Sequence, residues 1–483
     1  MILRILRTVL IAAGLVAIPF FATNPVLFST QQVTSADRQV SPKDLQITCA
    51  GPAVLGGGTT GTSVTSFKRT GTSLISYSFG APSGSTLVSA KGTKLTGYGV
   101  RQDSSARYKS SGSISVLDST GTIQQGSQLL TVNQLQLVKN KKIRGLLGAP
   151  CLRARSEFWL VGGSVAVGRE ALLVLTNPSQ VDATVDLDIY TENGVAHTAG
   201  LSGISVPAGK TEVLPLAAFV FRAESLAVHV KSIGGSITAL IQQKAVRGLG
   251  ASGADYVSPT IDSALDSVIP GILVRGSEDS TMLRKEDDKY SDVQQLLRVF
   301  VPGDKDAQLV FEVLGTDPKT FGTVLSVTAP AGKVTDFKIK GLADGDYVGY
   351  LKSDVKVFGS VRLVRSKASS GRFTDFAWIN PAEGFTTPRF IAVPKAGISK
   401  LSIVNPSSEP TTVSIQFGSQ TIKRNVAAGS EIVLTAPAAQ SVGIFPTNKA
   451  VYANLVVDVT GRIAVLPVLD EKNIGGQVLV SVH

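Results

Sequence analysis

Hydrophobic and polar residues alternate with a period of two along much of the chain, which predicts half-buried β-strands. In residues 184–189 the apolar positions are Val185, Leu187 and Ile189, with Thr or Asp between them. Residues 412–417 repeat the alternation. Short segments of this kind are separated by Gly, Pro, Asn and Ser, which favour turns. The pattern therefore predicts an all-β protein.

Three stretches of the chain repeat one order of strands and turns. Asn-Pro-Ser occurs at 177–179 and 405–407, with Val-Pro-Gly at 301–303 in the corresponding place. A Pro-Ala-Gly or Ala-Ala-Gly turn comes after each of them, at 207–209, 330–332 and 427–429. Repeats of about 100 residues are typical of antiparallel β-sandwiches of the immunoglobulin-like type. A solenoid would need shorter periods, roughly 20–50 residues.

The repeats and the composition divide the chain into six segments. These are 1–36, a signal peptide or signal-anchor helix; 37–46, a linker; 47–155, a first β domain closed by a disulfide; 156–262, a second β-sandwich; 263–372, a third, with a charged linker at its start; and 373–483, a fourth. The charged linker includes residues 283–290, which can form a helical turn. We expect tandem sandwiches to act as a rod with loops at its ends.

The N-terminus carries an export signal. Arg4 and Arg7 precede residues 8–28, which contain no charge. About 20 apolar residues suffice to span a bilayer, and positive charge before them favours export of the chain beyond the apolar segment. The small residues at 34–36 could be a cleavage site, so both a cleaved signal peptide and an uncleaved transmembrane anchor remain open. We expect the rest of the chain to be extracytoplasmic, either anchored to the membrane or secreted.

Cysteine content agrees with export. The chain of 483 residues has two cysteines, Cys49 and Cys151. An even count in an exported protein predicts a disulfide, whereas a redox pair usually has the Cys-x-x-Cys spacing. Closing so long a loop stabilises the fold by roughly 4–5 kcal/mol.

The net charge of +11 indicates attraction to anionic partners. The densest positive run contains Lys139, Lys141, Lys142 and Arg144. It is either a solvated loop or a contact with an anionic wall polymer or lipid surface. Nucleic acid is excluded as a partner by export and by an aromatic content of only 6%, which leaves few residues for base stacking.

The sequence offers little chemistry for catalysis or metal binding. Histidine occurs only at His197, His229 and His483, and the nucleophile motif Gly-x-Ser-x-Gly is absent. No Cys/His cluster suits zinc, and the pair Asp186 and Asp188 is too few ligands for calcium. A Gly-x-Gly-x-x-Gly match at 56–61 is followed by β-prone residues rather than by a helix. We therefore predict no catalytic site, no cofactor and no metal.

Both tryptophans precede a repeat, Trp159 ahead of the first copy and Trp378 ahead of the last. Large aromatic side chains at such positions pack in a core or between units. The alternative is a platform for carbohydrate, which would require the rings to be exposed on loops with Asp or Asn nearby.

One longer pattern resembles a known family. It consists of residues 156–163 (Ser-Glu-Phe-Trp-Leu-Val-Gly-Gly), 174–178, 206–209, Arg247-Gly248-Leu249 and Asp255-Tyr256-Val257. Together they resemble domain of unknown function 5719, found in secreted or membrane-anchored actinobacterial proteins. The resemblance implies an envelope location, no known activity and no functional residues to transfer.

These observations predict a non-enzymatic cell-envelope protein. It would serve as a scaffold or interaction module for an envelope protein, an anionic wall polymer or a polysaccharide. One alternative is a cell-wall glycan-binding protein. Another is an enzyme with a dispersed site, which would need a deep pocket lined by converging carboxylates or by His197 or His229.

Overall fold

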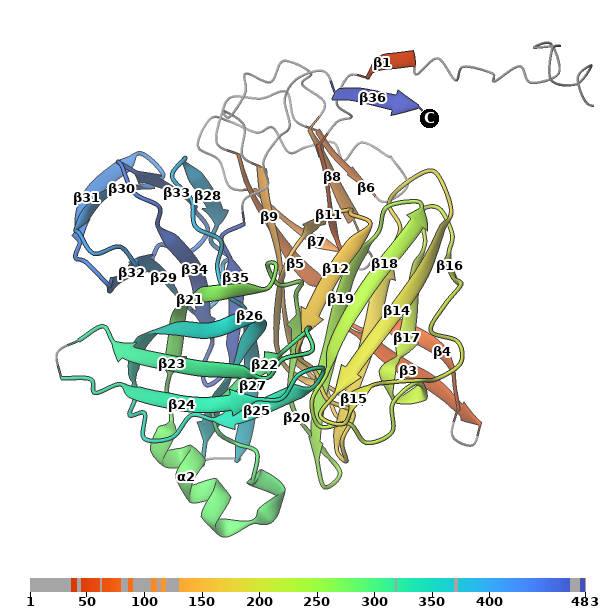
Figure 1. Cartoon of the computed structure of the whole chain (residues 1–483), viewed down its shortest axis with the longest axis horizontal. Coiled ribbons are helices and arrows are strands. Elements are labelled where there is room, and N and C mark those ends of the chain that lie inside the picture. The colour runs from red at the N-terminus through yellow and green to blue at the C-terminus, as the bar shows by residue number, and fades with distance from the viewer. Residues whose placement is uncertain are drawn as a thin grey trace, which may run out of the picture. The chain divides into compact units, whose positions relative to one another are not determined.

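The computed structural model describes residues 36–40, 45–60, 63–79, 86–89, 106–110, 114–118, 130–317, 319–368, 372–469 and 478–482 (Figure 1). Residues 44–474 form one compact body. Residues 1–43 and 475–483 form a separate terminal body, in which the structure describes the antiparallel pair β1 (Ala36–Val40) and β36 (Val478–Val482). Part of the predicted linker 37–46 thus belongs to β1, and the predicted N-terminal helix lies outside the described residues. Among the described residues, no helix has the length and apolar character needed to cross a membrane.

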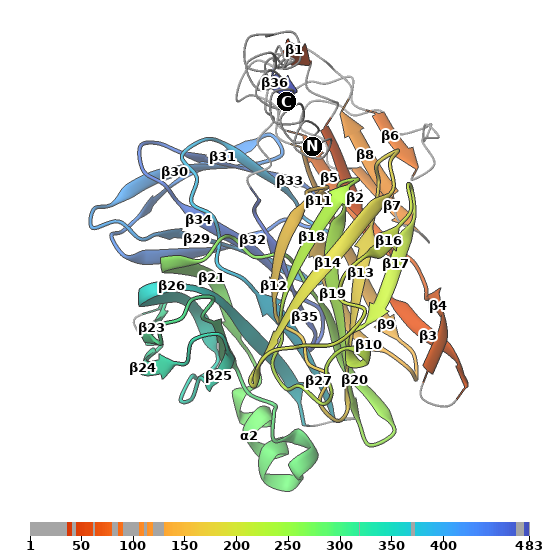
Figure 2. The same cartoon turned by 45° about the vertical axis from the view of Figure 1, so that its right-hand side comes forward.

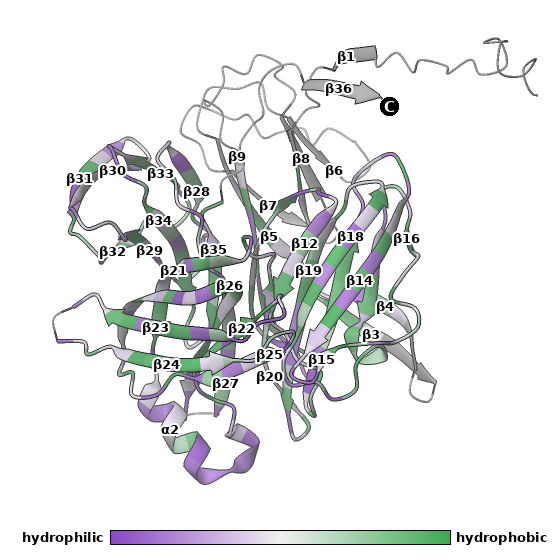
Figure 3. Ribbon diagram, viewed as in Figure 1, coloured by the Kyte–Doolittle hydropathy of each residue, from purple (hydrophilic) through white to green (hydrophobic). Residues whose placement is uncertain are grey.

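The described chain is almost entirely β-structure in antiparallel sheets, as the alternation predicts. The α-helix of the described residues, α2 (Ser277–Glu286), includes the start of the predicted charged linker and is largely hydrophilic in Figure 3. Leu283 is its apolar anchor and is fully buried. Asp344 accepts hydrogen bonds from the backbone N–H groups of Gly276 and Ser277 at 2.9 Å each, so it caps the N-terminus of this helix.

The second unit of the compact body consists of two sheets. One has the order β12 (Glu157–Val161), β18 (Ala227–Gly234), β14 (Ala183–Thr191), with β15 (Gly194–Val195) and β16 (Ile204–Val206) both paired to β14. The other has the order β17 (Thr211–Pro215), β13 (Arg169–Thr176), β19 (Thr238–Arg247), β20 (Gly250–Val257). Inward side chains of both sheets, among them Leu173, Leu187, Val230 and Ile241, share one hydrophobic cluster.

The fourth unit has the same topology. Its sheets are β28 (Arg389–Ala392), β33 (Ser441–Pro446), β30 (Thr411–Phe417), β31 (Gln420–Val426), and β32 (Ser430–Ala436), β29 (Ile398–Asn405), β34 (Tyr452–Asp458), β35 (Ile463–Pro467). If the strands of a unit are counted along the chain, leaving out the short β15, both units have the orders 1-6-3-4 and 5-2-7-8. The repeat in the sequence is therefore a repeat of topology.

The third unit differs in that one long strand, β26, takes the place of strands 6 and 7 of the other units. Its strands are β21 (Ala264–Val274), β22 (Leu296–Phe300), β23 (Ala307–Gly315), β24 (Thr323–Ala329), β25 (Val334–Lys338), β26 (Gly345–Lys367) and β27 (Phe373–Ile379). The 23-residue β26 pairs with β21 and β23 through its first half and with β22 and β27 through its second. Its first half therefore corresponds to strand 6 of the second and fourth units, and its second half corresponds to strand 7. The predicted boundary assigns residues 373–379 to the fourth segment, whereas the pairing of β27 with β26 makes them the last strand of the third unit.

The described strands of the first unit follow the same scheme in part, which the sequence does not reveal. Its strands are β2 (Leu45–Cys49), β5 (Ser73–Phe79), β6 (Thr86–Ser89), β7 (Ala106–Ser110), β8 (Ile114–Asp118), β9 (Leu130–Lys139), β10 (Arg144–Pro150) and β11 (Leu152–Arg153), with the hairpin β3 (Val54–Thr60) and β4 (Ser63–Arg69) inserted. They pair as β11-β2-β8-β6 and β10-β9-β5-β7. Thus β2, β8 and β6 match strands 1, 6 and 3, and β7, β5, β9 and β10 match strands 5, 2, 7 and 8, whereas β11 is an additional strand beside β2 and no described strand matches strand 4. The predicted disulfide is confirmed: the sulfur atoms of Cys49 and Cys151 are 2.00 Å apart, and they join β2 to the end of β10.

The recurring Asn-Pro-Ser has a structural cause. Asn177 and Asn405 are fully buried. The Nδ2 group of Asn177 donates to the carbonyls of Val181 and Val206 at 2.8 and 2.9 Å. Its Oδ1 accepts from the backbone N–H of Ser179 at 2.9 Å. Asn405 makes the same set of bonds, so one buried amide replaces missing backbone partners in each turn.

The last strands of the four units, β10, β20, β27 and β35, meet one another inside the compact body. β10 contacts β20, β20 contacts β27, β27 contacts β35, and β35 contacts β10, so the contacts form a closed ring. Figure 2 labels these four strands close to one another. The expectation of a rod is therefore wrong, because the first unit packs directly on the fourth. The reason lies in the strands themselves: all four are buried along most of their length, as inner strands rather than exposed sheet edges are.

Candidate functional site

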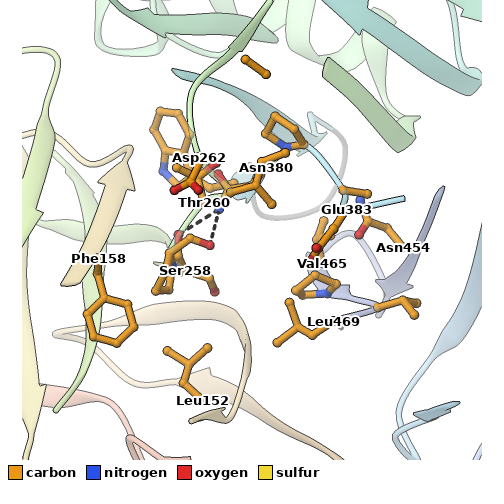
Figure 4. A pocket seen from close by; sticks show the side chains of 18 of the residues that line it. Leu152, Phe158, Ser258, Thr260, Asp262, Asn380, Glu383, Asn454, Val465 and Leu469 are labelled. Carbon is orange, nitrogen blue, oxygen red and sulfur yellow. Dashed lines mark hydrogen bonds between the residues drawn. The ribbon is translucent and has the colours of Figure 1, made fainter. Parts of the chain in front are cut away.

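A cavity of about 450 Å³ lies at the ends of β10, β20, β27 and β35, the central strands that form the closed ring. Its lining comes from residues 152–158, 258–264, 378–383 and 465–469, together with Asn454 (Figure 4). These are the segments in which the chain leaves β10, β20, β27 and β35. Binding residues in folded domains are often carried by such connections, so this cavity is the candidate site.

Aromatic side chains form part of the cavity wall. Trp378, on β27, is buried, and its indole Nε1 donates a hydrogen bond to Gln243 Oε1 at 2.7 Å. The guanidinium carbon of Arg298 lies 4.7 Å from its ring centroid. Phe158, on β12, is also buried and lines the cavity. These contacts fix the position of the Trp378 ring.

A side-chain amide joins two of the connections. The Nδ2 of Asn380, after β27, donates to the carbonyl oxygens of Ser258 and Pro259, after β20, at 2.8 and 3.3 Å (Figure 4). Its Oδ1 has no hydrogen-bond partner in the described part of the chain, and the same holds for Oδ1 of Asn454. Asn454 Nδ2 donates to the carbonyl of Pro270 at 3.0 Å.

The charges of the cavity wall balance. Arg153 and Arg155 come from the segment after β10, Asp262 from that after β20, and Glu383 from that after β27. Two cations and two carboxylates give the lining no net charge. The remaining wall is a mixture of hydroxyl groups, such as Thr260, and apolar side chains.

Beside the cavity, two buried aspartates cross-link the central strands. Asp255, on β20, accepts from the backbone N–H groups of Trp378 at 2.8 Å and Gly148 at 3.4 Å. Asp375, on β27, accepts from those of Leu146 at 3.0 Å and Ala254 at 3.2 Å. Each carboxyl group thus contacts strands of two other units.

Burial governs the ionisation of both aspartates. It raises the pKa of Asp375 to about 8, and it raises the pKa of Asp255 well above the usual value. Hydrogen bonds from backbone N–H groups act in the opposite direction and do not outweigh it. These groups hold the ring of strands together and lie outside the cavity lining.

The four predicted contact residues lie together on one hairpin. Lys139, Lys141, Lys142 and Arg144 are all exposed around the turn between β9 and β10. Asn140 Oδ1 holds the turn, because it accepts from the N–H groups of Lys142 at 2.9 Å and Ile143 at 2.8 Å. Among the described residues, no carboxylate forms an ion pair with any of the four cations. The turn lies at the start of β10, whereas the cavity lies beyond its end.

Of the three histidines, the structure describes His197 and His229. The two ring nitrogens of His229 both face carboxylates: Nδ1 is 3.2 Å from Asp188 Oδ2, and Nε2 is 2.6 Å from Glu157 Oε1. Neither nitrogen is within hydrogen-bond distance of a Ser, Thr or Cys side chain in the described residues. His197 is exposed, and His483 lies outside the described residues. Neither His197 nor His229 lines the cavity.

The other motifs from the sequence have structural roles. The Gly-rich residues 56–60 and the strand after them form the hairpin β3–β4. Asp186 Oδ1 accepts from the N–H of Gly203 at 2.9 Å. No group of three or more His, Cys, Asp or Glu residues in the described ranges is placed to hold a metal ion.

The tryptophans occupy different places in their units. Trp159 lies in the first strand of the second unit and Trp378 in the last strand of the third. Trp159 is half-buried, stacks on His229 with ring centroids 4.0 Å apart, and contacts Phe358 of the third unit at 4.7 Å. Both rings pack between units, as the packing interpretation predicts.

The cavity itself could not be found from the sequence. Its walls come from segments up to about 300 residues apart, which only the ring of last strands brings together. One local signal marks the ends of these strands. Each of them ends at or near a proline, namely Pro150, Pro259, Pro381 and Pro467, and proline ends strand pairing.

A family model, described as a family of unknown function (DUF5719), matches residues 104–444. The chain belongs to this family. The match confirms the predicted resemblance, and it covers more than half of the chain.

The DUF5719 match begins in the first unit and ends in the fourth, so it includes the basic hairpin and the cavity segments after β10, β20 and β27. No curated protein matches the chain. A solved structure titled "Ca2+-stabilized adhesin helps an Antarctic bacterium reach out and bind ice" is similar, with 10% identity, 89% of this chain and 99% of its own covered, and a TM-score of 0.11. A similarity at that TM-score supports no argument about this chain.

Proposed function

We propose that this protein is a non-enzymatic, extracytoplasmic scaffold of the cell envelope that binds an anionic wall polymer through the β9–β10 hairpin. In this proposal the four units are immunoglobulin-like β-sandwiches, and the N-terminal segment either anchors the chain in the membrane or is cleaved on secretion. The observation that carries the proposal is the placement of four exposed cations on one hairpin without a carboxylate partner in the described chain.

The geometry of the hairpin favours a long anion over a small one. Lys139, Lys141, Lys142 and Arg144 stand on a short exposed turn rather than around a cavity, so they cannot enclose an ion. A polymer with regularly spaced negative charges can contact several of them at once. The turn is held by Asn140 and continues into buried strands, which keeps the cations close together.

The disulfide supports the extracytoplasmic part of the proposal. Such bonds persist in oxidising compartments and are rare where glutathione or thioredoxin keeps thiols reduced. Alkylation of the chain in intact cells tests this: we expect both thiols to be blocked until a reductant is added, and the protein to fractionate with the envelope. Recovery from the cytosol with two free thiols would contradict the proposal.

Binding to a defined polymer tests the contact surface. We expect the full-length chain, purified in a neutral detergent, to bind dextran sulfate but not dextran, with an affinity that falls as salt rises. Replacing Lys139, Lys141, Lys142 and Arg144 by Ser should weaken binding at least tenfold, since a cation near an anionic surface contributes about 1 kcal/mol.

A matched variant controls for net charge. Lys333, Lys338, Lys340 and Lys356 of the third unit are also exposed, and their replacement by Ser removes the same charge from another place. This control should keep most of the affinity. Equal losses in both variants, or tight binding to anionic lipid vesicles without binding to the polymer, would refute the proposed contact.

A further inference from the structure

We propose that the cavity at the ends of the central strands binds one or two units of a neutral saccharide. This site is separate from the basic hairpin and independent of the anionic polymer proposed above. Its volume of about 450 Å³ lies within the range of roughly 300–1,000 Å³ typical of small-molecule sites.

The composition of the wall indicates the class of ligand. Pro467 and Leu469, which are half-buried, supply apolar surface in front of the buried Trp378 and Phe158 rings. Asn380, Asp262 and Thr260 supply groups that can accept or donate hydrogen bonds. A sugar ring presents apolar C–H groups and hydroxyl groups side by side, so it matches both kinds of surface. A purely hydrocarbon ligand would leave these polar groups without partners, which is costly.

The charge of the wall argues against an ion as ligand. Arg153 and Arg155 are balanced by Asp262 and Glu383, so neither an anion nor a cation gains from the cavity as a whole. Hydroxyl groups can donate to the carboxylates and accept from the guanidinium groups at the same time. A neutral polyol is therefore compatible with both signs of charge in the wall, whereas an ion of either sign is repelled by one of them.

The site is held in shape before any ligand arrives. Asn380 ties the segment after β27 to the one after β20 through Ser258 and Pro259. The segment after β10 starts at the disulfide of Cys151. A preformed site loses little conformational entropy on binding, which suits weakly binding ligands such as sugars.

Titration with disaccharides tests the proposal. The probes are maltose, cellobiose, mannobiose and N,N′-diacetylchitobiose, with glucose 6-phosphate as the anionic comparison. Labelling with 5-fluorotryptophan gives one fluorine signal for Trp378 and one for Trp159. We expect at least one disaccharide to shift the Trp378 signal with a stoichiometry of one, to leave the Trp159 signal in place, and to bind more tightly than glucose 6-phosphate.

Two variants locate the binding. Ser263→Phe puts a ring into the cavity lining and should weaken binding at least tenfold, whereas Ser202→Phe, the same change at an exposed loop position, should not. Asp262→Ala, at an exposed side chain, removes one acceptor without a change in packing and should weaken binding several-fold.

Three results would overturn the inference. They are no shift of the Trp378 signal with any disaccharide, undiminished binding in the Ser263→Phe variant, and tighter binding of the phosphorylated sugar. Replacement of the four hairpin cations should leave saccharide binding unchanged, so failure here and failure of the polymer contact can be told apart.

Discussion

Asp292 and Asp375 border the same small gap between the second and third units, yet their carboxyl groups have opposite surroundings. Asp292 forms ion pairs with Arg169 and with Arg247, whose Nη1 is 2.6 Å from Oδ1. Burial alone would raise the pKa of Asp292. The hydrogen bond from Arg247 and the positive charges of Arg169, Arg247 and Arg362 outweigh it and hold the pKa well below its usual range.

Asp375 has no ion pair in the part of the chain that the structure describes. It is 1% exposed, and its two oxygens accept from the backbone N–H groups of Leu146 and Ala254. Burial dominates and raises its pKa to about 8. At neutral pH this carboxyl group is therefore mostly protonated in the folded chain.

The difference shows two ways in which units of the same topology are joined. Around Asp292 the units are held by charge, which requires arginines from β13, β19 and β26 to converge. Around Asp375 they are held by a neutral acid that supplies acceptors to backbone N–H groups of two neighbouring strands. The first arrangement is weakened by acid and the second by base.

The largest effect is expected from a change that separates the strands around Asp375. Gly145 lies on β10, and a Cβ there would be 2.4 Å from Ala254 N and 2.6 Å from Ala254 O. Backbone atoms cannot move aside as a flexible side chain can, so Gly145→Ala should lower the free energy of unfolding by more than about 3 kcal/mol. Urea unfolding measures this loss.

Gly303 provides the control, because a Cβ there meets nothing within 4 Å. Gly303→Ala should change the free energy of unfolding by less than about 0.5 kcal/mol. A Gly145→Ala protein as stable as this control would mean that the central strands are not in close contact.

Removal of the charge at the other carboxylate comes next. Asp292→Asn leaves Arg169 and Arg247, which are 12% and 8% exposed, without their counter-charge. Breaking a buried pair costs about 3–5 kcal/mol, and since 32% of the Asp292 side chain is exposed we expect the lower end, about 3 kcal/mol. Asp304→Asn, at an exposed residue, is the matched control and should be nearly neutral. A loss below about 1 kcal/mol for Asp292→Asn would show that the arginines are solvated.

Local sequence patterns predict most of the strands and turns, but they predict little about the contacts among the four central strands. The alternation around Val185 and Val413 predicts half-buried strands because it depends only on residues two apart. The Asn-Pro-Ser repeats at Asn177 and Asn405 reveal the second and fourth units because each buried amide serves a turn within a few dozen residues. The disulfide follows from there being only two cysteines.

The centre depends on contacts between distant segments that leave no local signal. Asp255 and Asp375 stand among small and apolar residues and give no hint in the sequence that they bridge strands. The sequence places Trp378 at the start of the fourth unit. Because strands 6 and 7 of the third unit are one continuous strand, β26, the third unit shows one strand fewer in its pattern, and its last strand is assigned to the next unit. The closed ring of central strands also includes β10 of the first unit, and the sequence of that unit does not show the repeat. For these reasons the sequence predicts a rod and gives no sign of the cavity.

The smallest loss of stability at pH 5, and the most specific effect, comes from the Asp375 carboxyl group and shows as a change of slope with pH. The unfolded chain loses the Asp375 proton near pH 3.9, whereas the folded chain keeps it up to about pH 8. Between these values the folded state binds more protons, so the free energy of unfolding falls as pH rises, by at most about 1.4 kcal/mol per pH unit for this group. Asp292 acts in the opposite sense, since the stability it contributes is present above its unfolded pKa and is lost only as the pH falls further below it.

Asp375→Asn should remove that part of the slope. An amide has one acceptor oxygen, so either Leu146 or Ala254 loses its partner, and at pH 5 the variant should be less stable than the natural chain by about 1–2 kcal/mol. The difference should shrink as the pH rises above 5 and reverse at about pH 6, because each further pH unit destabilises the natural chain by about 1.4 kcal/mol relative to the variant. Urea unfolding at a series of pH values measures both slopes. Parallel slopes would mean that Asp375 is ionised in the folded chain, and the two carboxylates would then differ only in their partners.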